Sequence, residues 1–298
     1  MKNLIHLAFA LCLAACVSQP VTTTLSGLHA NNGAAVAIEL NRRYNLTYPN
    51  CWSSETAPAF LCSGVIIRAT TYGDTWNVWD PSPLAVSVGG VSFSYMRNDA
   101  RFPNIFPGTN NGYIVMPASA TPGGYMLFNY LCFFPIDGAS NNRSANGCGE
   151  HRLWGAISGY CSSQGVTTAE QFYANYLSHG QPYHQKQCSF DVHDNSPYQT
   201  ARLFREGVRA TPMLPPNNGY DENELIARVW TIQPASAMPI EAFFYLRGSA
   251  DGLSQAKKNQ QSYYGKTNGR IVPIISLSIA PTGYAATFQY SAADQMYQ

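Results

Sequence analysis

Six cysteines constrain this chain more than any other feature. The chain holds eight cysteines in all, and six remain once Cys12 and Cys16 of the N-terminal leader are set aside. An even number in an exported chain predicts disulfides, although sequence alone does not choose the pairing. The alternative, a metal site, lacks any C-x-x-C pair or H-E-x-x-H motif. The six candidates are Cys51, Cys62, Cys132, Cys148, Cys161 and Cys188. We expect Cys51 and Cys62 to form a local bridge and the other four to hold the middle of the chain.

The first residues have the features of a secretory signal. Lys2 precedes an apolar run from Leu4 to Ala15, broken only by His6, which is too short to span a bilayer as a helix. The run ends in Leu13-Ala14-Ala15-Cys16, which resembles the bacterial lipobox, whose cysteine becomes the lipidated first residue. The alternative is an ordinary cleaved signal in which Cys16 has no role. We therefore expect export by a bacterium, as an outer-membrane lipoprotein or a secreted protein.

Composition argues against nucleic acid as a partner. The formal net charge is +1 and only 12% of residues are charged, so no basic patch for nucleic acid or an anionic membrane is expected. No later stretch is apolar enough to span a bilayer, which leaves membrane contact to the lipid anchor. We expect a signal peptide at 1–15, a flexible tether at 16–32, one domain at 33–285 and a C-terminal tail at 286–298.

Hydrophobic spacing predicts helices and strands in irregular order. Val36, Leu40 and Tyr44 recur at a spacing of four, which predicts a helix over Gly33–Asn45. Further helices are expected from Thr167 and over Pro197–Arg209. Strands are expected over residues 64–70, 91–96, 112–116, 125–135, 225–232, 240–247 and 271–279. The order favours an α+β fold with flanking helices over an alternating parallel sheet, and the Asn-, Ser- and Gly-rich stretch 138–165 reads as a disulfide-held insertion.

Two strand segments offer a cation and paired hydroxyls. Arg68 follows the apolar run Val65-Ile66-Ile67, and its guanidinium would suit a phosphate; the plainer interpretation is a surface arginine whose stem covers apolar neighbours. In Gly89-Gly90-Val91-Ser92-Phe93-Ser94, alternation puts Ser92 and Ser94 on one face and Phe93 on the other. Two hydroxyls on one face can hold a carboxylate, although a polar edge strand would show the same pattern.

An acidic triplet, Glu222-Asn223-Glu224, leads into the predicted strand that starts at Leu225. In an extended segment both glutamates share a face. Paired carboxylates near a sugar bond can stabilise an oxocarbenium-like transition state and activate the attacking group. For an isolated acidic cluster, a solvated turn is the commoner structure. The three segments together, in this order, indicate a site that cleaves a nucleotide–sugar bond.

Taken together, the three segments resemble the arginine, S-x-S and E-x-E signature of the ADP-ribosyltransferase fold, in its cholera-toxin-like branch. The mature chain also resembles the halovibrins, exported bacterial proteins with ADP-ribosyltransferase or NAD-glycohydrolase activity. The segments that carry this second likeness are 40–45, 58–64, 79–83 and 239–245. The sequence departs from the branch at Phe93, where the usual run has a hydroxyl, and in the Cys132–Cys188 segment, which has no counterpart there.

The resemblance implies a split β-sandwich core and NAD+ as substrate, with no metal and no bound cofactor. Glu224 would then stabilise the sugar cation, with Ser92 orienting it. Glu222 would position or deprotonate the acceptor, which is water, a target protein or a small guanidino compound. The NAD-binding residues would be Arg68, Ser94, Phe93 and Gly90.

A non-catalytic alternative stays open on the sequence: a surface lipoprotein that binds a glycan or a protein through its Tyr- and Asn-rich loops.

Trp76 and Trp79 could stack on a flat ring but are more often packing residues. His179, His184 and His193 lie in a polar stretch and read as surface residues, with metal binding a distant second.

Overall fold

The computed structural model describes residues 32–51, 57–71, 79, 90–117, 129–138, 148, 160–178, 187–193, 196–216, 221–228 and 238–297. The expected signal peptide, Cys16 and nearly all of the expected tether lie outside these residues. The helices are α1 (Gly33–Asn45), α3 (Ala169–Ser178), α4 (Pro197–Ala210) and α5 (Gly252–Lys266), with short 3-10 turns at Ala59–Leu61, Cys161–Gln164, Thr211–Met213 and Ala292–Asp294. The strands are β1 (Asn50–Cys51), β2 (Ala57–Pro58), β3 (Val65–Thr70), β4 (Val91–Met96), β5 (Asn111–Val115), β6 (Asn129–Phe134), β7 (Phe190–Asp191), β8 (Glu224–Arg228), β9 (Ile240–Leu246), β10 (Ile274–Ile279) and β11 (Ala286–Tyr290).

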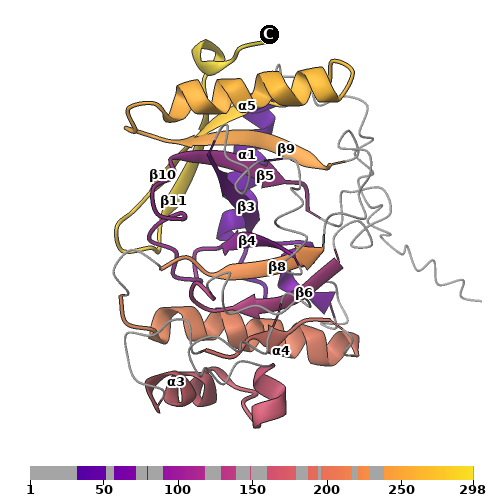
Figure 1. Ribbon diagram of the computed structural model, residues 1–298, viewed down its shortest axis with the longest axis vertical. Helices are drawn as coiled ribbons and strands as arrows, with labels where there is room; N and C mark the ends of the chain where they lie inside the picture. Colours follow the sequence, from indigo (N-terminus) through magenta and orange to yellow (C-terminus); the bar gives the residue numbers. More distant parts are fainter. Residues whose placement is uncertain are drawn as a thin grey trace, which may run out of the picture.

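Nine strands form one mixed sheet, in the order β11-β10-β9-β5-β3-β4-β8-β6-β7. β9 and β10 run parallel, and the other neighbours pair antiparallel. Helices and strands are interspersed along the chain, so the expected α+β class is confirmed. In Figure 1, α5 lies at one end of the molecule and α3 and α4 lie at the other, with the sheet between them.

The two faces of the sheet are covered by different helices. On one face, the apolar side of α1 packs against β3, β5, β9, β10 and β11, in a cluster that includes Leu40 and Phe288. On the other face, side chains from α3, α4 and α5 join the main core, among them Phe172, Phe204 and Tyr263. Burial of this apolar surface is the dominant favourable contribution to folding. The spacing of four that predicts α1 is therefore the spacing of the side chains that α1 buries.

The C-terminal segment corrects the expected tail. Residues 286–290 form β11, which pairs with β10, for example Leu277 with Phe288. The Asn41 side chain of α1 donates to the Phe288 carbonyl at 2.7 Å and accepts from its N–H at 3.1 Å. The sheet thus extends past the expected boundary at residue 285, because Phe288 fills a place in the core beneath α1.

Three disulfides connect the six cysteines. The expected local bridge Cys51–Cys62 is confirmed. The four remaining cysteines join as Cys132–Cys148 and Cys161–Cys188. Cys132 lies in β6 and Cys188 lies two residues before β7, so the two bridges attach Cys148 and Cys161 to the part of the chain that forms these two strands. A bridge stabilises mainly by restricting the unfolded chain, typically by about 2–4 kcal/mol.

Candidate functional site

The three segments singled out from the sequence lie side by side in the sheet. β4 pairs with β3, with Ile67 opposite Ser94, and with β8, with Ser92 opposite Ile226. β6 flanks β8 on its other side (Figure 1). The arginine strand, the serine strand and the strand that starts with a glutamate are thus neighbours, and β6 adds a fourth strand that the sequence did not connect to them.

Glu224 is the first residue of β8, and donors from two elements hold its carboxylate. The Ser92 hydroxyl donates to Oε1 at 2.5 Å, and the backbone N–H of Gly138 donates to Oε2 at 2.9 Å. Glu224 is 8% exposed. Hydrogen bonds to an ionised carboxylate are about twice as strong as those between neutral groups. Both carboxylate oxygens are therefore fixed in orientation, while the group keeps some contact with solvent.

Asn223 fixes the backbone between the two glutamates. Its side-chain oxygen accepts from the Tyr95 N–H at 2.8 Å, and its amide donates to the Tyr95 carbonyl at 2.9 Å. The side chain thereby takes the place of a backbone partner at the end of the β4–β8 ladder. The sequence named Asn223 only as part of the acidic triplet, and an amide between two acids carries no recognisable signal for this role.

Glu222 is in a different environment from Glu224. It is 3% exposed, and among the described residues neither of its carboxylate oxygens has a hydrogen-bond partner outside its own residue. Burial raises the pKa of Glu222 to about 9, the negative charges of Asp137, Glu224 and Asp221 act in the same direction, and its own backbone N–H opposes the shift. The side chain is therefore a neutral acid at neutral pH.

Arg68 lies against the serine strand. Its guanidinium donates to the backbone carbonyl of Ser92 at 2.5 Å, and the residue is buried. Arg68 is opposite Tyr113 in the β3–β5 ladder, whereas Ile67 is opposite Ser94. Side chains of register partners share a face of the sheet, so the Arg68 side chain leaves β3 on the face opposite the two serine side chains. It supports the backbone that carries Ser92.

The other predicted residues of the serine strand divide between the site and the core. The expected alternation is observed: Ser92 and Ser94 are half-buried, whereas Phe93 is buried with its ring 6.1 Å from that of Tyr113. Gly90 lies where a Cβ would come 2.7 Å from a methyl group of Ile226. Phe93 thus contributes packing at this position, and Gly90 allows β4 to approach β8 closely.

Residues from the disulfide-held segment complete the surroundings of the glutamates, and the sequence did not single them out. The backbone N–H of Gly138 donates to Glu224, and the negative charge of Asp137 adds to the rise that burial causes in the pKa of Glu222. The amide of Gln187 donates to the carbonyls of Ile136 and Asp137, each at 2.8 Å. None of these residues belongs to a motif, because their partners are 50 or more positions away in the chain.

Two of the weaker candidates, Trp79 and His193, lie among the described residues. Trp79 is buried, with its ring 5.1 Å from that of Tyr263 in an edge-to-face arrangement, so the packing interpretation is confirmed. His193 is half-buried, and its backbone N–H donates to the Asp191 side chain at 3.0 Å. Trp76, His179 and His184 lie outside the described residues. Within the described part of the chain, no group of three or more His, Cys, Asp or Glu residues could hold a metal ion.

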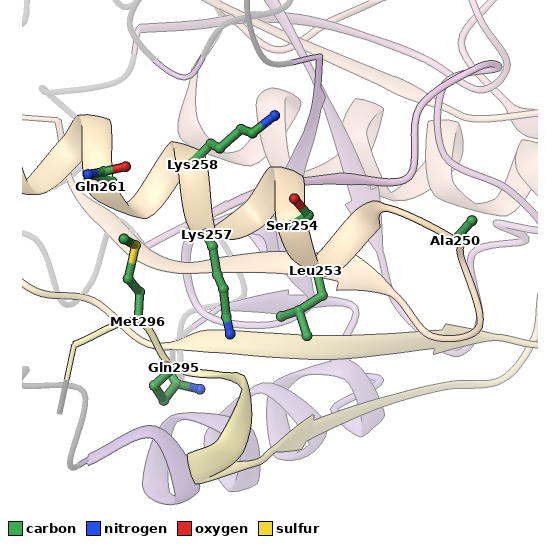
Figure 2. A pocket seen from close by; sticks show the side chains of 8 residues that line it. All are labelled: Ala250, Leu253, Ser254, Lys257, Lys258, Gln261, Gln295 and Met296. Atoms are coloured by element: carbon green, nitrogen blue, oxygen red, sulfur yellow. The ribbon is translucent and has the colours of Figure 1, made fainter.

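A surface hollow of about 740 Å³ lies elsewhere, between α5 and the C-terminal residues (Figure 2). Its eight lining residues are Ala250, Leu253, Ser254, Lys257, Lys258, Gln261, Gln295 and Met296. The two lysines point in different directions from the helix, so they do not converge on one anion. None of the predicted site residues lines this hollow.

No protein-family model matches the chain, and no curated protein matches it. Among the described helices, none has the length and apolar character needed to cross a bilayer. Any function must therefore be argued from the site itself.

Proposed function

We propose that this protein is an exported enzyme that consumes NAD+ by cleaving the bond between nicotinamide and ribose. The products would be nicotinamide and ADP-ribose, the latter transferred to a protein, to a guanidino compound or to water. The observation that carries the proposal is the hydrogen bond between Ser92 and Glu224, residues 132 positions apart. It supports the proposal because it brings the serine segment and the glutamate segment together, as the resemblance to the ADP-ribosyltransferase signature implies. On this proposal the mixed sheet is an ADP-ribosyltransferase-like split β-sandwich.

Glu224 would stabilise the sugar cation. As the bond from nicotinamide to the ribose breaks, its electron pair leaves with nicotinamide and positive charge develops on the ribose. A carboxylate at about 4 Å in an effective dielectric of 20 stabilises that charge by about 4 kcal/mol, which corresponds to roughly three decades of rate. The two donors that hold Glu224 support this role, because a carboxylate that is already oriented needs no reorganisation during the reaction.

Glu222 would serve the acceptor. The incoming oxygen or nitrogen forms a bond to the ribose carbon, and its proton passes to the Glu222 carboxylate. Glu222 can accept a proton only when it is ionised, and its pKa is about 9. The rate should therefore rise with pH up to about that value, unless a guanidinium acceptor lies beside Glu222 and favours its charged form.

Arg68 and Ser94 would bind the rest of the substrate. The Arg68 side chain leaves β3 on the other face from the serines, and its guanidinium reaches the β4 backbone at the Ser92 carbonyl. We propose that its fixed positive charge attracts the two phosphates of NAD+ from there. The hydrogen bond from Arg68 to the Ser92 carbonyl ties the position of this charge to the strand that orients Glu224. The scheme uses no metal: Glu224 is the partner of the sugar cation, and Arg68 is the partner of the phosphates.

The test is to incubate the oxidised mature domain with NAD+ and to measure free nicotinamide, with and without a small guanidino acceptor. Glu224→Gln should lower the rate by about a thousandfold. Glu170→Gln, at an exposed residue of α3, is the control and should retain the rate. Full activity in Glu224→Gln would contradict the role of Glu224. No release by the wild type under any of these conditions would favour the non-catalytic lipoprotein.

A further inference from the structure

The chain leaves β6 and brings the backbone of Gly138 into contact with the Glu224 carboxylate. We call residues Ile136–Gly138 the 136–138 arm. Its last residue, Gly138, donates its backbone N–H to Oε2 of Glu224 at 2.9 Å. A Cβ at this position would lie 3.0 Å from the same oxygen and 2.9 Å from the ring of Phe134. Both distances are tighter than ordinary van der Waals contacts, so the backbone approaches the carboxylate as closely as it does because residue 138 has no side chain.

The 136–138 arm is itself held by one side chain. Gln187 is fully buried, and its amide donates to two carbonyls of the arm, those of Ile136 and Asp137, each at 2.8 Å. Two N–H groups from one nitrogen thus satisfy two buried backbone acceptors. If both donors were lost, the two carbonyls would be left buried without these partners, which costs free energy unless the arm moves.

Disulfides fix the position of Gln187. The residue directly precedes Cys188, which is bonded to Cys161. Ser189 follows Cys188. Its carbonyl accepts from the Cys161 N–H at 2.8 Å, and its hydroxyl donates to the Cys148 carbonyl at 2.7 Å. Cys148 is bonded in turn to Cys132 of β6. The segment that carries Gln187 is therefore tied to the strand from which the 136–138 arm emerges.

We propose that Gln187 is a positioning residue for Glu224, acting through the 136–138 arm, and that this arm and Gln187 are part of the active site. This inference rests on the proposed function. The Ser92 hydroxyl can rotate, and one donor alone would allow the carboxylate to turn about its last bond. A second donor on a separate, rigid element restricts that rotation. Catalytic groups that are misplaced by about 1 Å can lose about a hundredfold in rate.

Gln295 provides a matched control within the same chain. It too is buried, and its amide donates to two backbone carbonyls, those of Ile274 at 2.8 Å and Ser291 at 2.9 Å. These partners belong to the β10 region and the C-terminal turn, and none of them contacts the glutamates. Replacing either glutamine by methionine keeps a similar volume and removes the donors. Gln295→Met also removes the acceptor of the Ile274 N–H, so it should lose at least as much stability as Gln187→Met.

The experiment measures kcat and KM for nicotinamide release at a temperature well below the unfolding midpoint of each variant. Gln187→Met should lower kcat roughly tenfold to a hundredfold with KM unchanged. Gln295→Met should lower the unfolding midpoint and leave kcat unchanged. Combined with Ser92→Ala, Gln187→Met should show a non-additive effect on kcat, because both act on one carboxylate, whereas Gln295→Met should be additive.

Gly138→Ala keeps the inference testable if Gln187→Met does not fold. Its new methyl group would press on Oε2 of Glu224, so kcat should fall while Gln187 stays in place. An active wild type with unchanged kcat in Gln187→Met, or in Gly138→Ala where that is the folded variant, would overturn the positioning role and leave the proposed function standing. A wild type that releases no nicotinamide would overturn both.

Discussion

Two buried glutamates, in different regions of the sheet, show how burial can serve structure or chemistry. Glu241 in β9 and Glu222 before β8 are almost equally buried, at 7% and 3% exposed. Glu241 forms an ion pair with the buried Arg43 of α1. Glu222 faces other acids, and neither of its oxygens has a hydrogen-bond partner elsewhere in the described residues. Burial raises the pKa of both, and at Glu241 the charge and hydrogen bond of Arg43 oppose the rise.

The difference teaches which buried acid is available for chemistry. A charge buried with a partner is neutralised within the fold, and its partner cannot be removed without cost. A carboxyl group buried without a partner costs free energy that packing elsewhere must offset. Such groups are found more often at functional sites than in ordinary cores. The α1 side of the sheet therefore uses its buried acid to attach a helix, whereas the β8 side keeps its buried acid uncompensated.

The largest expected effect comes from breaking the compensated pair. Arg43→Met should lower the free energy of unfolding by about 3–5 kcal/mol, because it leaves the Glu241 carboxyl group buried without its partner. Urea unfolding of the oxidised protein measures the change. Arg42→Met, at the neighbouring exposed arginine that pairs with Glu39, is the control and should cost less than about 1 kcal/mol. Equal effects in the two variants would show that burial does not distinguish these ion pairs.

The next effect tests the uncompensated acid through pH. The ordinary pKa of Glu222 is 4.5 and that of the folded protein is about 9. Between these values the folded state binds one proton more than the unfolded state, so stability falls as pH rises, by about 1.4 kcal/mol for each pH unit. Glu222→Gln removes this contribution. The variant should therefore gain about 1.4 kcal/mol relative to the wild type for each pH unit, or about 3 kcal/mol between pH 6 and pH 8.

Urea midpoints at several pH values within that window check the sign. Glu170→Gln is the control, because the pKa of Glu170 is lowered and its contribution is lost only in acid, below the window. A difference between wild type and Glu222→Gln that stays constant with pH would show that Glu222 is ionised in the folded protein. The proton-accepting role would then no longer require a raised pH.

The strands of the site could be predicted from sequence because their signals are local. β4 has the expected bounds, and the alternation of serines with apolar residues is the alternation observed. α5 was missed because its sequence has few apolar residues. It buries the amides of Asn259 and Gln260, which bind Thr70, Asn111 and the Val272 carbonyl. A helix that buries polar side chains lacks the apolar stripe by which helices are recognised.

The surroundings of the glutamates could not be predicted, because they depend on contacts between distant segments. Nothing near Gly138 or Gln187 in sequence points to Glu224 or to the arm. The raised pKa of Glu222 likewise follows from burial and from Asp137, which β6 brings close to it. β11, by contrast, was predictable, since Ala286, Phe288 and Tyr290 alternate with polar residues as expected for a half-buried strand.

The smallest expected effect isolates the cost of the unpaired charge from the value of the ion pair. Arg43→Met combined with Glu241→Met replaces both charges by apolar side chains of similar length, and such replacements are often nearly neutral. The double variant should lie within about 1 kcal/mol of the wild type in urea unfolding, although each single variant costs more. If the two single effects added, the loss in Arg43→Met would come from packing of the arginine stem. The contrast with Glu222 would then rest on hydrogen bonding alone.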